Sequence, residues 1–193
     1  MATFNLTKYY SKQGLWSLFL ICAFPLHIWT LFMGFRDFDW VTARTNSWDA
    51  VGVVSYGLFF TFFESLFVFA IAIILGFLIS RTWDEKKRIA VIGILIIILS
   101  IWSVVNQTYF LQVMSPSEKF IGFYINTGRP LVALYVTALV LVSVSVVFPT
   151  FTILRSSKAE KVILEGFDRL SMLMVLYLFL DIVALIIILI RNI

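Results

Sequence analysis

The sequence predicts an all-α integral membrane protein, a bundle of about five transmembrane helices with short interfacial helices. Two observations about composition support this fold class. The chain is 61% hydrophobic and 13% charged, whereas a soluble domain carries about 25% charged residues. Its apolar residues form five runs of about 20 or more, the length needed to cross the hydrocarbon core. Almost all charged residues fall in the short intervals between these runs.

The apolar runs occupy most of the chain, which leaves no room for a separate soluble domain. We therefore expect a single polytopic membrane domain over residues 1–193. Its transmembrane helices are predicted at about 14–35, 51–80, 89–112, 131–153 and 170–190. Pro25 lies in the first of these and lacks a backbone N–H, so it is expected to kink that helix.

The interval after the first run, residues 36–50, is predicted to be a polar loop. Ser47 or Asp49 is expected to cap the second helix. The charged and tryptophan side chains of this loop suit contact with lipid headgroups or a partner, or alternatively a solvated, salt-bridged turn. These residues are Arg36, Asp37, Asp39, Trp40, Arg44 and Trp48.

Two further intervals carry signals for short interfacial helices. The sequence Ser-Pro-Ser-Glu at 115–118 combines a capping box with an early proline, which predicts a helix over about 116–126. A second capping box, starting at Ser157, opens an amphipathic segment over 157–168 that is expected to enter the fifth transmembrane helix near Gly166.

Small residues recur every fourth position in the second run. Ala72, Gly76 and Ser80 form a stripe that would let another helix approach closely. We expect this stripe to be a helix-packing surface, within the chain or against a partner.

The distribution of Lys and Arg predicts the orientation. With the N-terminus in the cytoplasm, the inner segments hold ten of these residues and the outer segments five, as the positive-inside rule requires. We therefore expect a multi-pass plasma-membrane protein with a cytoplasmic N-terminus and an external C-terminus.

Three ionisable residues lie near the middle of apolar runs. His27 lies at roughly 0.6 of its span, and Glu64 and Asp181 at roughly 0.55, counted from the inner end at 1.5 Å per residue. Tyr177 precedes Asp181 by four residues and shares its helical face. An ionised carboxylate at mid-membrane costs about 2.5–3.5 kcal/mol, so both acids are expected to face the bundle interior.

This intramembrane polar site has three interpretations. The acids and the histidine could be hydrogen-bonded contacts between helices. They could form a proton or cation path, because buried acids and a histidine titrate near neutral pH. They could also bind a metal, although the His-x-x-x-His and Glu-x-x-His spacings are absent.

The missing motifs limit the function. The patterns HExxH, GxSxG and the phosphate-binding P-loop are absent, so we assign no catalytic residue, metal or cofactor. The basic residues are too dispersed for nucleic acid. The sequence favours a non-enzymatic subunit or accessory component of a membrane assembly, in contact with lipids and with other subunits or a second copy. The alternatives are a small proton- or cation-coupled transporter using Glu64 and Asp181, and a lipid- or polyprenyl-processing enzyme.

The predicted orientation can be tested by cysteine labelling in a Cys22→Ser background. A membrane-impermeant maleimide added outside intact cells should label Thr45→Cys and Asn126→Cys and leave Lys87→Cys unlabelled. The reverse pattern would show the opposite orientation, and labelling of all three would show a different number of spans.

Overall fold

In the computed structural model, the described residues (9–79, 82–111 and 117–193) form helices joined by short turns, without a strand among them. Five helices are long and apolar enough to cross a membrane. The all-α membrane fold predicted from the sequence is therefore confirmed. The elements are α1 (Lys12–Arg44), α2 (Ser47–Leu78), α3 (Glu85–Asn106), the π-turn η2 (Gln107–Leu111), α4 (Glu118–Ile125), α5 (Pro130–Arg155) and α6 (Ser157–Asn192).

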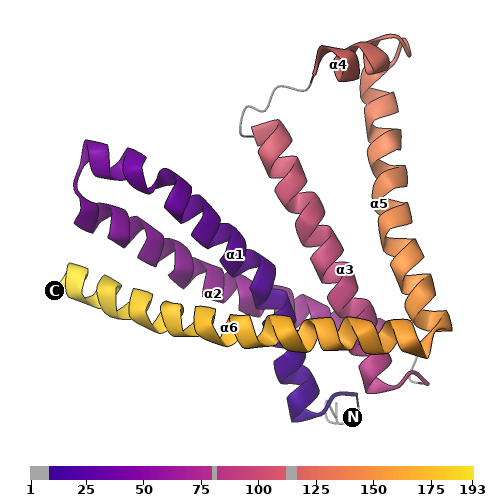
Figure 1. Cartoon of the computed structure of the whole chain (residues 1–193), viewed down its shortest axis with the longest axis horizontal. Helices are drawn as coiled ribbons and strands as arrows, with labels where there is room; N and C mark the ends of the chain where they lie inside the picture. Colours follow the sequence, from indigo (N-terminus) through magenta and orange to yellow (C-terminus); the bar gives the residue numbers. More distant parts are fainter. Residues whose placement is uncertain (1–8, 80–81, 112–116) are drawn as a thin grey trace, which may run out of the picture.

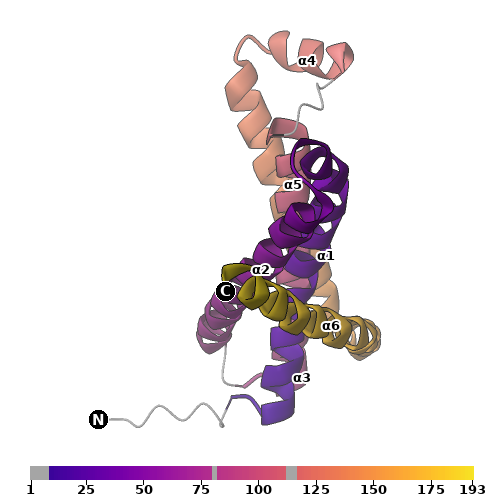
Figure 2. The ribbon, with the colours of Figure 1, turned by 90° about the vertical axis from the view of Figure 1, so that its left-hand side faces the viewer.

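The long helices form two groups that meet near the start of α1. Helices α1, α2 and α6 pack against one another, and α3 packs against α5. Helix α1 also contacts α3, which joins the two groups. Figure 1 shows α6 running across the direction of α5, and Figure 2 shows α4 at the far end of α5, away from the rest of the chain.

Helix α1 is longer than the predicted first span. The expected loop over 36–50 is wrong, because the helix continues to Arg44 and only Thr45 and Asn46 connect it to α2. The segment 36–44 contains no glycine or proline, so nothing in it stops the helix. The helix therefore extends about 13 Å beyond its apolar run, at 1.5 Å per residue. Pro25 lies inside α1, and the ribbon changes direction along its length (Figure 1).

Side-chain caps set the helix boundaries, in places one residue from the predicted caps. The α2 cap is Asn46, whose Oδ1 accepts a hydrogen bond from the Asp49 N–H at 2.9 Å, not Ser47 or Asp49. The α6 cap is Ser156, which accepts from the Ala159 N–H at 3.2 Å. Such caps satisfy N–H groups that have no partner inside the helix.

The predicted amphipathic helix over 157–168 and the last span form one continuous helix. Helix α6 runs without a break from Ser157 to Asn192, 36 residues. Gly166 lies inside it. A single glycine lowers helix stability by about 1 kcal/mol relative to alanine and does not end a long helix. The predicted short helix near 116–126 is present as α4, capped by Ser117, while Ser115 and Pro116 lie outside the described residues.

The largest apolar core lies where α1, α2, α3 and α6 meet. Its fully buried members are Tyr10, Leu18, Ile21, Cys22, Ala72 and Ile92. Beside it, the buried Arg88 donates a hydrogen bond from Nη1 to the Tyr9 carbonyl at 3.1 Å. Its guanidinium lies 5.1 Å from the Tyr9 ring centroid and 5.6 Å from that of Tyr10. Burial raises the pKa of Tyr10 to about 12. These contacts hold the segment before α1 against α3.

The C-terminal end of α6 is fixed to the start of α2. Arg191 donates from Nη2 to Asp49 Oδ1 at 2.7 Å and from Nη1 to the Trp48 carbonyl. Its guanidinium also lies 5.4 Å from the Trp48 ring centroid. It fits because residue 52 is glycine; a Cβ there would lie 2.6 Å from the guanidinium carbon.

The close approach at Gly76 gives a stability prediction. A Cβ at this position would collide with the Tyr10 hydroxyl and lie 3.1 Å from Ile92 Cδ1. Gly76→Leu should therefore lower the free energy of unfolding by about 1–3 kcal/mol, as expected for an overfilled core. Thermal unfolding in detergent measures this.

The matched control is Ala70→Leu, measured like Gly76→Leu on the isolated chain, because Ala70 is an exposed small residue on the same helix. It should leave the melting temperature nearly unchanged. Equal effects of the two substitutions would show that Gly76 is not at a tight contact.

Candidate intramembrane polar site

The structure places His27 of α1 directly against Asp181 of α6. The two atoms His27 Nε2 and Asp181 Oδ2 are 2.9 Å apart. His27 is 0% exposed, and the Asp181 side chain is 10% exposed. The other ring nitrogen, Nδ1, lies 2.9 Å from the Ala23 carbonyl oxygen, one turn earlier in α1.

These contacts define how many protons the pair holds. A carbonyl oxygen only accepts, so Nδ1 carries a hydrogen and donates it to Ala23. One further proton lies between Nε2 and Oδ2, on the imidazole or on the carboxyl group. In either form the net charge of the pair is zero. A buried pair without net charge avoids most of the cost of placing an isolated ion at mid-membrane.

Apolar side chains pack beside the pair. Phe19, Leu20, Ala23 and Met174 are buried in one cluster beside it, and the Phe19 ring contacts that of Phe62 edge-on at 6.5 Å. A hydrogen bond is stronger in such surroundings than in water. The pair therefore links the middle of α1 to a point about two-thirds of the way along α6.

One turn further along α1, a second polar contact reaches α2. Thr30 Oγ1 and Thr61 Oγ1 are 2.6 Å apart. Hydroxyl pairs of this kind hold membrane helices together because lipid offers them no other partner. The middle of α1 thus makes one polar contact with each of its two long neighbours.

Glu64 does not join this site. Its side chain is exposed on α2, and it makes no hydrogen bond or ion pair with any residue that the structure describes. The prediction that both acids face the interior is therefore wrong for Glu64. Equal depth along two spans places residues at one level of the membrane but does not determine the face of the helix on which each lies.

Tyr177 also has a different role from the one expected. It packs, half-buried, against the cluster beside the pair, and its hydroxyl does not donate to Asp181. Oδ1 of Asp181 is buried, and within the described part of the chain no donor reaches it. Spacing of four residues put Tyr177 on the right face, but the carboxyl group turns toward His27 instead.

The geometry of His27, Glu64 and Asp181 does not support a metal site. No group of three or more His, Cys, Asp or Glu side chains that could hold a metal ion occurs among the residues described. His27 and Asp181 alone would supply two ligands. This is too few for the four-coordinate sites that histidine and carboxylate usually form.

The small-residue stripe of α2 lies in the core of the chain. Ala72 is 1% exposed and Gly76 is buried, and both contribute to the region where α2 meets α3 and the segment before α1. Ser80 lies outside the described residues.

The residues expected in the first loop are instead on helices. Arg36 pairs with its neighbour Asp37 at 2.7 Å, and both are well exposed. The Arg44 guanidinium stacks over the Trp40 ring, 3.9 Å from its centroid, and Asp39 is exposed. Trp48, at the start of α2, contacts Arg191.

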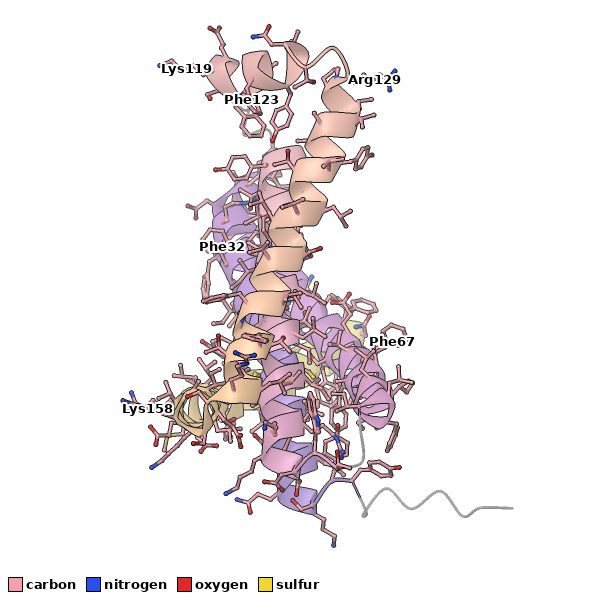
Figure 3. All side chains as sticks on the ribbon, turned by 90° about the vertical axis from the view of Figure 1, so that its right-hand side faces the viewer. Phe32, Phe67, Lys119, Phe123, Arg129 and Lys158 are labelled. Atoms are coloured by element: carbon pink, nitrogen blue, oxygen red, sulfur yellow. The ribbon has the colours of Figure 1, made fainter. Side chains whose placement is uncertain are left out.

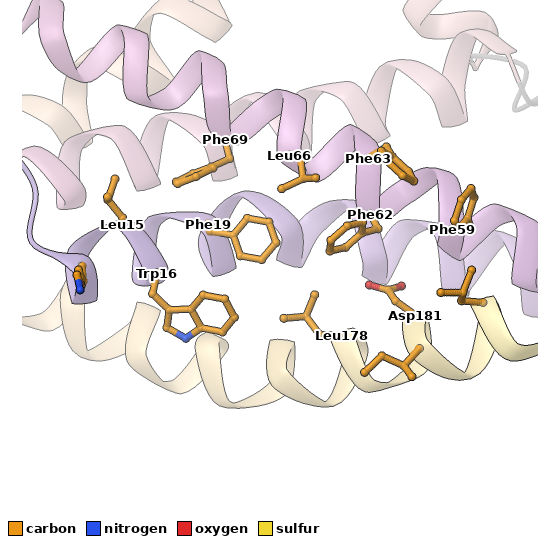
Figure 4. A pocket seen from close by; sticks show the side chains of 13 residues that line it. Leu15, Trp16, Phe19, Phe59, Phe62, Phe63, Leu66, Phe69, Leu178 and Asp181 are labelled. Atoms are coloured by element: carbon orange, nitrogen blue, oxygen red, sulfur yellow. The ribbon is translucent and has the colours of Figure 1, made fainter. Parts of the chain in front are cut away.

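A groove beside the pair was not predicted from the sequence. It has a volume of about 790 Å³ and lies between α1, α2 and α6. Phenylalanine rings of α1 and α2 form much of its wall, and among the residues that the structure describes Asp181 is the only acidic one lining it (Figure 4). A sequence signal does exist, because Phe59, Phe62, Phe63 and Phe69 recur at helical spacing. This pattern alone is equally typical of a lipid-facing surface.

Comparison of the chain with protein-family models, with curated proteins and with solved structures finds no match.

The pairing predicts different effects for two substitutions of Asp181. Asp181→Asn should be tolerated, because its amide N–H can donate to His27 Nε2. Asp181→Ala leaves that buried nitrogen without a partner and should lower the free energy of unfolding by about 1–3 kcal/mol. Thermal unfolding in the same detergent measures both.

The control is Asp168→Ala, which removes an exposed acid from the same helix and should have little effect. If alanine and asparagine at position 181 are equally destabilising, the hydrogen bond to His27 is not the important contact.

Proposed function

We propose that this chain is a non-enzymatic component of a larger membrane assembly, in which a partner helix covers the Glu64 face of α2. The observation that carries this proposal is an ionisable side chain at mid-span, exposed on the surface of the bundle. Polar groups within membrane spans are almost always placed against protein or water. A lone chain would present Glu64 to lipid.

A carboxyl group within a membrane span is costly unless it has a hydrogen-bonding partner. Placing an acid at the centre of a lipid-exposed helix costs about 2.5–3.5 kcal/mol. Within the described ranges no side chain of the protein offsets that cost by bonding to Glu64. A hydrogen-bond donor on a neighbouring helix would do so.

The apolar residues around Glu64 support the same proposal. Exposed residues follow α2 at alternating spacings of three and four, the pattern of helices that pack side by side. They are Val53, Tyr56, Phe60, Phe63, Phe67, Ala70 and Ile74. Phe67, one turn from Glu64, projects away from the ribbon in Figure 3.

Helix α5 presents a second exposed apolar surface. None of the residues in its most apolar 18-residue window is buried. It is held mainly by α3, through contacts that include a 2.9 Å hydrogen bond from Trp102 Nε1 to Ser145 Oγ. A spanning helix with so little contact inside its own chain has ample surface for a partner.

The alternatives receive less support. Coupled transport by Glu64 and Asp181 needs the two acids to act together, and Glu64 does not line the groove that contains Asp181. A lipid-processing site at the end of α1 would use acids that include Asp37, which is already engaged by Arg36.

The test is the mass of the complex and the stoichiometry of its subunits after purification in mild detergent. Glu64→Leu should raise the dissociation constant of the complex about threefold, the effect of losing one interhelical hydrogen bond of about 0.6 kcal/mol, so a smaller fraction of the chain is in the complex at concentrations near that constant. Glu64→Gln keeps a side chain able to hydrogen-bond and should retain most of the complex. The isolated chain should be no less stable in either variant.

Glu118→Leu is the control, because it removes an exposed acid of α4, outside the long spans. The proposal fails if the wild-type chain runs as a monomer without a stoichiometric partner, or if Glu64→Leu leaves the complex intact.

A further inference from the structure

The groove beside the His27–Asp181 pair combines two features that together specify a kind of ligand. One is a large apolar wall, and the other is a buried oxygen atom without a donor. The volume of about 790 Å³ lies within the range of small-molecule sites, which are mainly apolar with a few polar groups that fix orientation.

The wall of the groove suits a hydrocarbon chain or ring system. It is formed by aromatic and branched aliphatic side chains, including Phe19, Phe62, Phe69 and Leu178 (Figure 4). Trp16, Leu66 and Ile182 also line it and are themselves exposed on the bundle surface. A molecule dissolved in the membrane could therefore enter from the side, between α2 and α6.

Lys12, an exposed residue at the start of α1, also lines the groove. The buried polar group of the groove is Asp181. The Asp181 side chain is nine-tenths buried. Its Oδ2 atom is hydrogen-bonded to His27. Oδ1 is buried, and no donor from the described residues reaches it. Leaving such an acceptor unmet in apolar surroundings is costly, so a ligand that brings a donor gains the full value of one hydrogen bond.

The His27–Asp181 pair does not require a charged ligand to balance it. Because His27 Nδ1 donates to Ala23, the pair has no net charge in either of its forms. Oδ1 is then a neutral acceptor, or part of a carboxylate already balanced by imidazolium. A cation would add uncompensated charge to an apolar site, whereas a hydroxyl group would not.

We propose that this groove binds a lipid-soluble alcohol or phenol, whose apolar body packs against the phenylalanine rings and whose hydroxyl donates a hydrogen bond to Asp181 Oδ1. Glu64 does not line this groove, whereas Phe63 belongs both to its wall and to the α2 face proposed for the partner helix.

The test uses the full chain in phosphatidylcholine nanodiscs and a photoactivatable long-chain alcohol carrying an alkyne tag. The comparison probe is the methyl ether of the same molecule, which has the same chain but cannot donate. The alcohol should label groove residues about three- to tenfold more than the ether, the factor that one neutral hydrogen bond provides. Unlabelled hexadecanol should compete, and hexadecyl methyl ether should not.

Three variants assign the effect to the groove. Asp181→Asn keeps an oxygen acceptor while its N–H group donates to His27, so it should keep the preference for the alcohol, and Asp181→Leu should abolish it. Leu185→Trp fills the groove without touching the pair and should reduce labelling by the alcohol. Its matched control, Leu176→Trp, alters an exposed leucine of the same helix outside the groove and should leave labelling unchanged. Glu64→Leu should also leave it unchanged.

Several results would overturn the proposal. Equal labelling by the alcohol and the ether would mean that the groove holds only acyl chains of bulk lipid. Stronger competition by hexadecylammonium than by hexadecanol would show an anionic site. Persistence of the alcohol preference in Asp181→Leu would show that another group makes the contact.

Discussion

The hydrogen bond between His27 and Asp181 joins α6, about two-thirds of the way along its length, to the middle of α1, and the packing of these two helices depends on that contact. Inside a bilayer, apolar side chains gain little by meeting each other rather than lipid, so packing and polar contacts decide which helices associate. A single well-placed pair of this kind carries more weight than it would in a soluble core. Its zero net charge allows it to lie at mid-span without a further ion to balance it.

Each main pair of neighbouring helices likewise shares at least one polar contact. Thr30 and Thr61 join α1 to α2, Arg191 and Asp49 join α6 to α2, and Trp102 and Ser145 join α3 to α5. At the start of α1, Ser11 donates from its backbone N–H and its hydroxyl to Glu85 Oε1 at 2.8 and 2.9 Å. Apolar packing fills the space between these contacts, and the contacts determine the register.

Much of the fold follows from run lengths and composition, because a helix that crosses a membrane needs a long apolar segment and little else. The ends were harder to place. Charged residues in 36–44 and 157–168 mark where a span leaves the hydrocarbon, but a helix has no reason to stop there, so α1 and α6 continue. For the site, depth correctly placed His27 and Asp181 at one level. It could not separate Asp181 from Glu64, since the face of a helix that meets protein depends on which neighbours pack there. Arg191 and Asp49 lie at matching ends of their helices and could have been paired by the same depth count.

Helix α6 is one uninterrupted element of 36 residues, about 54 Å long at 1.5 Å per residue. It therefore acts as a rigid rod between distant parts of the protein. Its first turns lie near the end of α5, Asp181 lies about two-thirds of the way along it, and its last turn holds Arg191 against α2. Because a continuous helix resists bending and twisting, a rotation imposed near Ser157 would reach both the His27 contact and the Arg191 contact together.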